Sequence, residues 1–395
     1  MRVLMMSTPV PTHFTPMVPL AWALRAAGHE VLVAGQPDVM PAVAAAGLNG
    51  VSVGSAYHVE DLLADTVKEG TRPIEAQPRA EHESKLGKAG MGWSVHTRYL
   101  CEAYVETARA FGPDLVVCDP LEFSALIVGA LTGAPVVRHR WGVDPLSDTA
   151  HAQAGQSLRA MSERLGLGAY PDPALVLDPC PPSLQLPGTT AGTPIRYVPY
   201  NGNGRLPQWV GGPRAGNVPR RVAVSLGGRT LDMNGVPMLR RMLHVFGAQP
   251  DVEVIATVDE RHREALGTLP GTVRLVDPAP LNLFLHTCEA VVHHGGAGTT
   301  MTSTAFGLPQ LVVPQFADQF AHGDRIADAG AGITLDDADS QNDPASLRDA
   351  FTELLTNPGH SKAAQELRRE MTDMPSPSRV VADLEQLARG EHRPQ

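Results

Sequence analysis

Short apolar runs alternate along the chain with longer stretches in which apolar residues recur every three or four positions. Residues 2–7 and 30–34 are two such short runs, and the helical stretch 19–27 between them is followed by Gly28. A short apolar run predicts a buried strand, a period of three to four predicts an amphipathic helix, and glycine suits a helix end. The pattern therefore predicts βα units on a parallel sheet, an α/β fold class.

The same alternation continues through both halves of the chain. In the first half it predicts a strand at 114–118, a helix at 123–131 and a strand at 134–138. Strands predicted in the second half lie at 222–226, 252–258, 273–276, 290–293 and 311–313. With 395 residues and about 150 residues per domain, two sizeable domains are expected.

A turn-rich stretch separates the two halves. Residues 199–221 hold many Gly and Pro residues with little periodicity, so we expect an interdomain linker there. The predicted domains are residues 1–198 and 222–375, and the last helix, within residues 376–395, would pack back on the first domain. Residues 57–93 are charged and turn-rich without a clear period, and for them we expect a mobile loop region.

Composition excludes several classes of function. The net charge is −10 and no run of Lys or Arg occurs, which argues against a nucleic-acid partner. No apolar stretch approaches the ~20 residues that span a bilayer, and the N-terminus lacks a signal-peptide pattern, so we expect a cytoplasmic protein with no membrane insertion. The four cysteines lie far apart without CxxC spacing, which predicts reduced thiols and no zinc site.

A glycine-rich segment follows the predicted strand at 290–293. Residues 293–300 read HHGGAGTT and lead into a predicted helix at 299–306. Glycine permits close backbone approach and a helix start offers unpaired N–H groups, so we expect this loop to hold phosphate; an ordinary tight turn is the alternative. His293 and His294 would point to opposite faces of a strand, which disfavours a shared metal. The sequence SLGGRT at 225–230 is a second, weaker candidate.

The loop after the first strand carries a candidate general base, His13. It lacks the GxGxxG fingerprint, and the chain has no Gly-Lys-Ser/Thr, so neither a nicotinamide dehydrogenase nor a P-loop is indicated. In a doubly wound sheet this loop lies at the carboxyl edge, where ligands bind. Asp119 ends another strand of the same sheet and would accept the other ring N–H, with Glu122 as a weaker partner. A purely structural histidine is the alternative.

Asp318 and Gln319 follow the predicted strand at 311–313. A carboxylate beside an amide suits the hydroxyls of a sugar, whereas a helix N-cap is the ordinary alternative. Either reading places both residues at a strand end of the second domain.

Together these residues resemble glycosyltransferase family 1 with the GT-B architecture, and within it the actinobacterial enzymes that attach deoxysugars to polyketides and other natural products. The resemblance covers the whole chain. It is carried mainly by residues 293–299, 309–311 and 318–319, with support from His13, Arg140-Trp141, residues 178–184 and Met374-Pro375. It implies two Rossmann-like doubly wound domains facing each other across a cleft. Residues 198–202 and 280–285 are similar to rhamnose-transferring members.

The resemblance implies a role for each candidate residue. His13 would be the general base, with Asp119 behind it, and His293 would bind the α-phosphate. The other donor-binding residues implied are Ser225, Gly227, Gly228, Ala279, Gly296, Gly298, Thr299, Asp318 and Gln319. The reaction would be an inverting, metal-independent transfer from a dTDP- or UDP-sugar to a hydrophobic aglycone, with no cofactor.

Two departures from the family pattern bear on these roles. Pro11-Thr12 precedes His13 where glycines are common in the family. Pro278 stands where a base-stacking Trp is common, so the preferred nucleobase of the donor is left undetermined. Asp337 and Asp339 resemble the metal-binding carboxylates of another glycosyltransferase architecture, but no other ligand cluster accompanies them. A nucleotide-sugar epimerase of the same architecture and a non-catalytic partner protein remain the alternatives, and the oligomeric state, a homodimer included, stays open.

Overall fold

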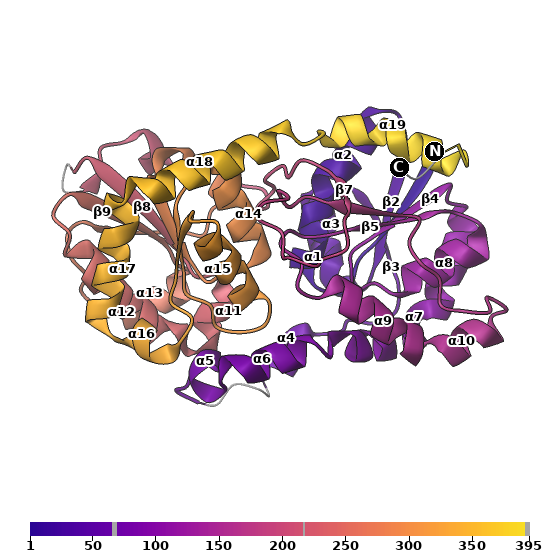
Figure 1. The fold of residues 1–395 in the computed structure, drawn as a ribbon, viewed down its shortest axis with the longest axis horizontal. Coiled ribbons are helices and arrows are strands. Elements are labelled where there is room, and N and C mark those ends of the chain that lie inside the picture. Colours follow the sequence, from indigo (N-terminus) through magenta and orange to yellow (C-terminus); the bar gives the residue numbers. More distant parts are fainter. Residues whose placement is uncertain (65–68, 216–217, 392–395) are drawn as a thin grey trace.

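The computed structural model describes residues 1–64, 69–215 and 218–391 and shows two α/β domains beside one another (Figure 1). The first domain contains seven parallel strands in the order β3-β2-β1-β4-β5-β6-β7. Their bounds are β1 (Arg2–Met6), β2 (Glu30–Gly35), β3 (Asn49–Ser52), β4 (Leu115–Cys118), β5 (Val136–His139), β6 (Leu175–Asp178) and β7 (Thr193–Pro194).

The second domain repeats this arrangement with six parallel strands in the order β10-β9-β8-β11-β12-β13. Their bounds are β8 (Arg220–Ser225), β9 (Val252–Thr257), β10 (Val273–Val276), β11 (Ala290–His293), β12 (Gln310–Val312) and β13 (Gly332–Thr334). In each sheet the strand order reverses beside the first strand, so the predicted fold class of two Rossmann-like doubly wound domains is confirmed.

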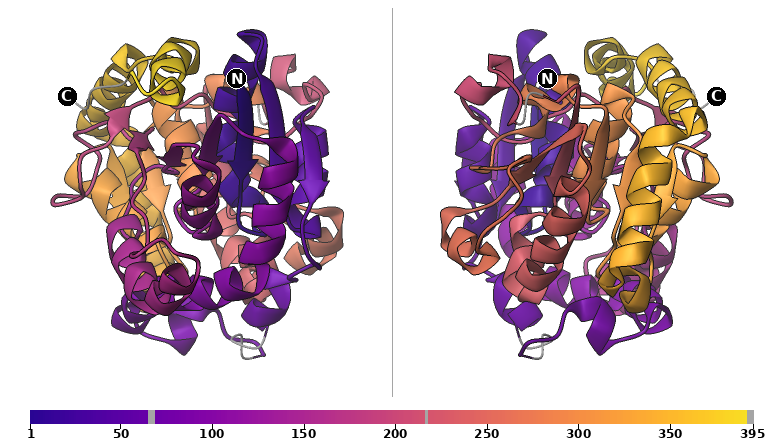
Figure 2. Two further views of the ribbon diagram at one scale, coloured as in Figure 1. Left: turned by 90° about the vertical axis from the view of Figure 1, so that its right-hand side faces the viewer. Right: turned by 90° about the vertical axis from the view of Figure 1, so that its left-hand side faces the viewer.

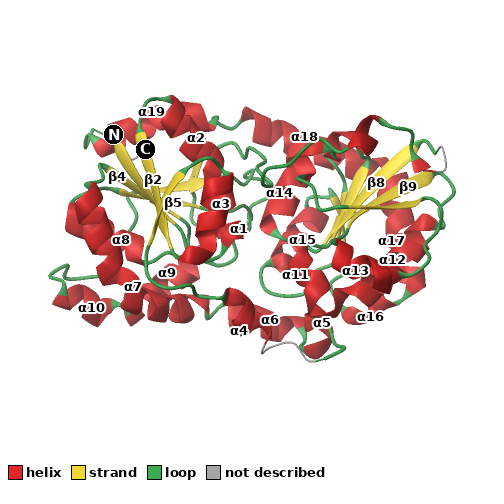
Figure 3. Cartoon of the chain, turned by 180° about the vertical axis from the view of Figure 1, so that it is seen from behind, coloured by secondary structure: helices red, strands yellow, loops and turns green. Residues whose placement is uncertain are grey.

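Helices cover both faces of each sheet, as the cartoon seen from behind also shows (Figure 3). Those of the first domain are α1 (Pro11–Phe14), α2 (Val18–Ala26), α3 (Met40–Ala45), α4 (Val59–Ala64), α5 (Pro73–Ala76), α6 (Arg79–Leu86), α7 (Ala89–Phe111), α8 (Ser124–Thr132), α9 (Ser147–Ser157) and α10 (Arg159–Arg164). Strands covered on both faces must be apolar throughout, which explains why Val3–Met6 of β1 are fully buried.

The second domain and the C-terminal region supply the remaining α-helices. They are α11 (Gly228–Thr230), α12 (Val236–Gly247), α13 (Glu260–Leu266), α14 (Ala297–Phe306), α15 (Gln319–Asp328), α16 (Ala338–Asn342), α17 (Pro344–Thr356), α18 (Pro358–Asp373) and α19 (Pro377–Ala388). None of the helices in the described residues is long and apolar enough to cross a membrane.

The end of the chain returns to the first domain. Helix α19 packs on α2, and Val380, Val381 and Leu384 lie in the same apolar cluster as the buried residues of β1 and β2. The His29 ring adds a 2.9 Å contact to the Glu385 carboxylate. Helix α19 therefore lies on the same side of the molecule as the N-terminus, as two side views show (Figure 2).

The prediction of a loop region without regular structure over residues 57–93 is wrong for the described part of that range. Helices α4, α5 and α6 form there, and α7 begins at Ala89. We call residues 71–86 the arm, because they run beneath the molecule from the first domain to the second (Figure 1). The arm has no apolar period in the sequence. Polar contacts, some buried and some exposed, hold it in place instead of a buried apolar face.

Candidate functional site

The candidate base lies where β1 and β4 end side by side, at the point where the strand order reverses. Met6 pairs with Cys118, so Thr8 after β1 and Asp119 after β4 lie next to each other. The chain then forms the single turn α1, begun by Pro11, which presents His13. Proline at the first helical position costs no hydrogen bond, so Pro11 supports this turn.

A hydroxyl stands between His13 and Asp119. His13 Nδ1 lies 2.7 Å from Thr8 Oγ1, and Thr8 Oγ1 donates to Asp119 Oδ2 at 3.0 Å. The direct His13–Asp119 hydrogen bond expected from the sequence is therefore wrong. Because the Thr8 proton points to the carboxylate, its oxygen accepts the Nδ1 proton, and Nε2 is left as the proton acceptor.

Asp119 is buried and well held. Its carboxylate accepts the Thr8 N–H at 2.7 Å and the Leu121 N–H at 2.8 Å. Burial nevertheless raises the pKa of Asp119 to about 6. Burial, and then the charge of Asp119, raises the pKa of Glu122 to about 8, so Glu122 is neutral at pH 7. Of these two carboxylates, Asp119 is the one linked to the imidazole, through Thr8.

Aromatic rings surround the candidate base. The Trp141 ring stacks on the His13 imidazole with centroids 4.0 Å apart, and Trp93 lies 6.4 Å away. Tyr57 stacks on Trp93 at 5.8 Å. Burial, and then the charge of Arg229, lowers the pKa of His13 to about 3, so the imidazole is neutral at physiological pH. Arg229 belongs to α11, which places the second domain directly opposite the base.

Two buried ion pairs of Arg140 position the Trp141 backbone. Arg140 is 1% exposed and contacts Asp178 at 2.8 Å and Asp144 at 2.7 Å. The Gln185 side chain also donates to Asp178. The structure thus joins two sequence motifs, Arg140-Trp141 and the segment beginning at Asp178, into one support behind the aromatic wall.

His293 does not face the glycine loop. Its side chain is fully buried, its Nδ1 accepts the Gly295 N–H at 3.0 Å, and its Nε2 lies 2.8 Å from Gln310 Oε1. Both ring nitrogens are occupied inside the protein, so the assignment of His293 to the α-phosphate is wrong. His293 instead shapes the loop by holding Gly295, and the core-histidine alternative fits this residue.

His294 occupies the place expected for the phosphate ligand. Its half-buried ring lies between two glycines, since a Cβ at Gly227 would lie 3.1 Å from the ring and one at Gly296 only 2.5 Å. Its Nδ1 has no hydrogen-bond partner among the described residues, and the Ser225 backbone lies close to the ring. Burial lowers the pKa of His294 to about 4, so one ring nitrogen carries a proton to donate and the other can accept.

The other predicted donor-binding residues gather around His294. His293 pairs with Ser225, so the loops after β8 and β11 are neighbours. This brings together Ser225, Gly227, Gly228, Gly296, Gly298 and Thr299. The Ser225 hydroxyl accepts from Thr257 at 3.1 Å, and Gly298 has open space where a side chain would stand. Ala279 follows β10 and packs on the apolar cluster around Phe284.

Asp318 and Gln319 begin α15. Asp318 is the residue before the helix but caps no backbone N–H with its side chain, which is 25% exposed. Gln319 Oε1 accepts the Gln315 N–H at 2.8 Å, which leaves the amide group as the part able to reach a ligand. The ordinary N-cap alternative therefore does not account for Asp318.

His322 was not found from the sequence. It is 1% exposed, its Nδ1 lies 2.5 Å from Gly295 O, and its Nε2 lies 3.1 Å from Val143 O. Gly295 belongs to the glycine loop and Val143 follows Trp141 by two residues. One side chain therefore ties the donor loop to the segment stacked on His13. Its spacing of four from Asp318 was the only signal in the sequence.

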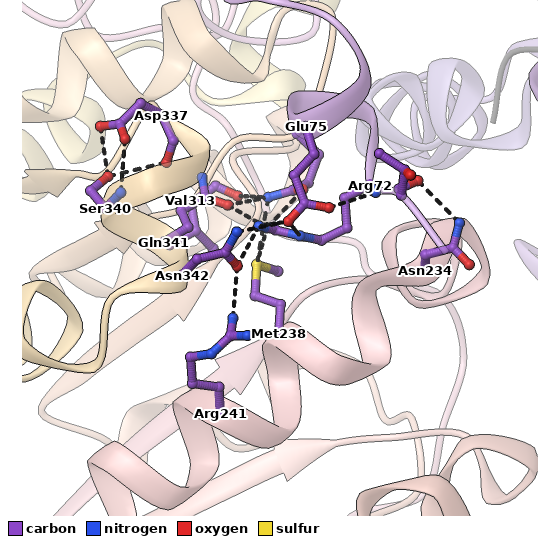
Figure 4. Close-up of polar contacts among 12 residues, drawn as sticks. Arg72, Glu75, Asn234, Met238, Arg241, Val313, Asp337, Ser340, Gln341 and Asn342 are labelled. Atoms are coloured by element: carbon purple, nitrogen blue, oxygen red, sulfur yellow. Dashed lines mark hydrogen bonds and ion pairs between the residues drawn. The ribbon is translucent and has the colours of Figure 1, made fainter. Parts of the chain in front are cut away.

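The arm is fixed to the second domain by a buried arginine (Figure 4). Arg72 is 3% exposed, and its guanidinium donates to Gln341 Oε1 at 2.7 Å and to Asn342 Oδ1 at 3.0 Å. Glu75 accepts from the same group at 2.8 Å. Farther along the arm, Arg79 pairs with Asp324 and Asp336.

A cavity of about 280 Å³ lies between the arm and the second domain, next to the predicted sugar site. Its walls are Pro73, Ala76, Gln77, His82, Lys85, Leu86, Ala89, Met233, Phe316 and Ala317. Phe316 and Ala317 directly precede Asp318. The described residues contain no group of three or more His, Cys, Asp or Glu side chains that could hold a metal ion, and Asp337 accepts the Ser340 N–H at the start of α16.

The fold and the two facing sites define a glycosyltransferase of the GT-B class, and comparison with known proteins identifies its family. Residues 22–227 match the family described as Erythromycin biosynthesis protein CIII-like, N-terminal domain, and residues 241–387 match its C-terminal domain. The chain belongs to the Erythromycin biosynthesis protein CIII-like family of glycosyltransferases.

Two relatives align over nearly the whole chain. L-demethylnoviosyl transferase of Streptomyces niveus is 37% identical over 387 residues, covering 97% of each chain. The solved structure of Spinosyn Rhamnosyltransferase SpnG is 37% identical with a TM-score of 0.85, covering 98% of this chain and 100% of that one. SpnG has also been solved with thymidine diphosphate and with spinosyn aglycone, at TM-scores of 0.86. The predicted resemblance and enzyme class are confirmed.

Proposed function

We propose that this enzyme moves a 6-deoxyhexose such as rhamnose from a dTDP- or UDP-sugar to a hydroxyl of a hydrophobic, polyketide-like aglycone. The acceptor would bind to residues 1–198 and the donor to residues 222–375, with 199–221 as the linker. The observation that carries the proposal is the chain from Asp119 through Thr8 to His13, which faces the glycine loops of the opposite domain. The SpnG complexes with thymidine diphosphate and aglycone support the two ligand classes.

The chemistry begins at the base. His13 Nε2 takes the proton of the acceptor hydroxyl while the hydroxyl oxygen forms a bond to the anomeric carbon. Thr8 and Asp119 stabilise the imidazolium that results. Its Nδ1–H donates to the Thr8 hydroxyl, and that hydroxyl donates to the Asp119 carboxylate. The bond from the anomeric carbon to the diphosphate breaks on the opposite face, so the configuration inverts and no sugar-enzyme intermediate forms.

The leaving diphosphate gains negative charge as its bond to the sugar breaks. Unpaired N–H groups at Gly298 and Thr299, in the first turn of α14, and a ring N–H of His294 would meet that charge in fixed positions. The loop from Ser225 to Gly228 would line the other side of the diphosphate. These donors replace the role of a metal ion, and we propose that transfer is metal-independent.

Sugar and aglycone contacts follow from the rest of the site. Asp318 and the Gln319 amide would bind hydroxyls of the donor sugar. The aromatic wall of Tyr57, Trp93 and Trp141 would pack on the aglycone, since flat apolar rings bury large area at little entropic cost.

The test compares two histidines in opposite domains. His13→Ala should lower turnover by about 10²-fold or more and leave thymidine diphosphate affinity unchanged, because it removes only the base. His294→Ala should weaken thymidine diphosphate binding by ~1.5–3 kcal/mol, the cost of losing a hydrogen bond to a charged group. Calorimetric titration and turnover assays of both variants measure this.

Two results would contradict the assignment. Loss of nucleotide affinity in His13→Ala, with full affinity in His294→Ala, would place donor and acceptor in the wrong domains. Epimerised sugar formed from the donor alone, with no acceptor present, would favour the epimerase alternative.

A further inference from the structure

One face of α7 is apolar and open to solvent. Met91 is 48% exposed, Val95 is 51% exposed and Tyr99 is 84% exposed. Residues four positions apart lie above one another on a helix, so these three side chains form a single row. The opposite face of the helix, which includes the buried Tyr104, packs into the first domain.

Charged residues of opposite sign stand at the two ends of this row. Lys88 directly precedes α7, and Glu102 lies one turn beyond Tyr99. Both side chains are exposed, and neither forms an ion pair with another described residue. Gly92 lies beside the row with nothing within 4 Å of a Cβ built on it, so a second helix can approach closely there.

We propose that the α7 row, defined as Lys88, Met91, Val95, Tyr99 and Glu102, is the interface of a homodimer with two-fold symmetry. In an antiparallel pair of α7 helices centred on Val95, each Val95 meets its own copy. Met91 then meets Tyr99 of the second copy, and Lys88 meets Glu102. A two-fold interface must complement itself in this way.

The order of the charges selects a second copy in this orientation. A parallel pair would bring Lys88 to Lys88 and Glu102 to Glu102, whereas the antiparallel pair forms two opposite-charge contacts. The row spans 14 residues from Lys88 to Glu102, about 21 Å of helix at 1.5 Å per residue. Trp93 lies about 200° around the helix from Met91, so the dimer leaves the aromatic wall of the acceptor site free.

The first test introduces a thiol on the symmetry axis. The four native cysteines are all buried, so Val95→Cys adds an exposed thiol to a chain that has no other. Under mild oxidation the two axial thiols should form an intersubunit disulfide, visible on a non-reducing gel. Leu165→Cys, at a residue 39% exposed on another surface, is the matched control. Equal cross-linking of both variants would overturn the proposal.

The second test exchanges the charges. Lys88→Glu and Glu102→Lys alone each create two like-charge contacts per dimer and should raise the dissociation constant by about tenfold, measured by sedimentation velocity. The double variant restores opposite charges and should dimerise like the parent protein. Thymidine diphosphate binding, unchanged in all three variants, reports that each is folded. A monomeric parent protein, or no recovery in the double variant, would overturn the proposal.

Discussion

Thr8 determines how the carboxylate of Asp119 acts on the candidate base. Its hydroxyl donates to Asp119 and accepts from His13 Nδ1, so it fixes both the ring orientation and the tautomer. A carboxylate that is two hydrogen bonds away still favours the imidazolium, because each polarised hydrogen bond strengthens the next. The base therefore depends on a residue that has no titratable group of its own.

Replacement of Thr8 separates this role from packing. Thr8→Val keeps the shape but breaks the hydrogen-bond chain, and turnover should fall by about 10–10²-fold, within the range of a general-base contribution. Thr8→Ser retains the hydroxyl and should keep most of the activity. Both variants should bind thymidine diphosphate like the parent enzyme in calorimetry. Equal activity in the two variants would show that the hydroxyl has no part in catalysis.

The pH dependence of activity should report Asp119 rather than His13. The raised pKa of Asp119, about 6, means that the carboxylate carries its charge above pH 6 and takes a proton below it. His13 has a pKa lowered to about 3, so it stays neutral throughout this range. We expect kcat/KM to fall as pH drops through about 6, and this limb to be absent in Asp119→Asn. A limb that persists in that variant would assign it to another group.

The choice between His293 and His294 shows the limit of the sequence at this scale. Strand alternation predicts that adjacent histidines point to opposite faces, and the structure agrees. It does not say which of the two faces the loop, because the sheet is covered on both sides and both faces accept a histidine. Two contacts decide the orientation of His293. Gln310 lies 17 positions further along the chain, and Gly295 lies in the turn that follows the strand.

At the scale of elements, hydrophobic period predicted the helices and strands of the two sheets well and the arm not at all. Strands such as β8 and helices such as α12 bury apolar residues, and these residues recur at a regular spacing in the local sequence. The arm is held to the second domain by Arg72 and Arg79, whose oxygen acceptors in that domain lie more than 240 positions away in the chain. No local pattern can report such partners.

The arm gives a prediction of its own. Arg72→Ala removes a buried guanidinium that donates to Gln341, Asn342 and Glu75. Gln341 and Asn342 keep other donors, Gln315 and Arg241, so the loss should cost about 1.5–3 kcal/mol, the range for hydrogen bonds to a charged group. We expect the arm to detach and to be cleaved faster in limited proteolysis. Thymidine diphosphate affinity should be unchanged.

A partly exposed arginine of the same arm, Arg79, is the matched control. Arg79→Ala removes ion pairs that are about one-third exposed to solvent, and such pairs are worth ~0–1 kcal/mol. It should leave the proteolysis rate close to that of the parent enzyme. Arm cleavage that is equally fast in both variants would show that Arg72 is no special anchor.

At the scale of the whole molecule, several contacts hold the two domains in register. The arm crosses on one side, α18 and α19 cross on the other, and His322 lies between them. His322 connects Gly295 in the donor loop to Val143 beside the aromatic wall. Its two ring nitrogens face two carbonyl oxygens, one in each domain.

This geometry makes His322 a positioning residue for transfer. His322→Phe keeps the ring volume but removes both ring nitrogens, so the contacts to the Gly295 and Val143 carbonyls are lost and the domains lose a fixed spacing. Turnover should fall by about tenfold or more while thymidine diphosphate affinity changes little, because the phosphate contacts belong to the second domain alone. His360→Phe is the control, since His360 contacts one carbonyl, Gly330, within one domain. Its variant should lose stability in chemical denaturation but keep its turnover; equal turnover losses in the two variants would show that His322 has a purely structural role.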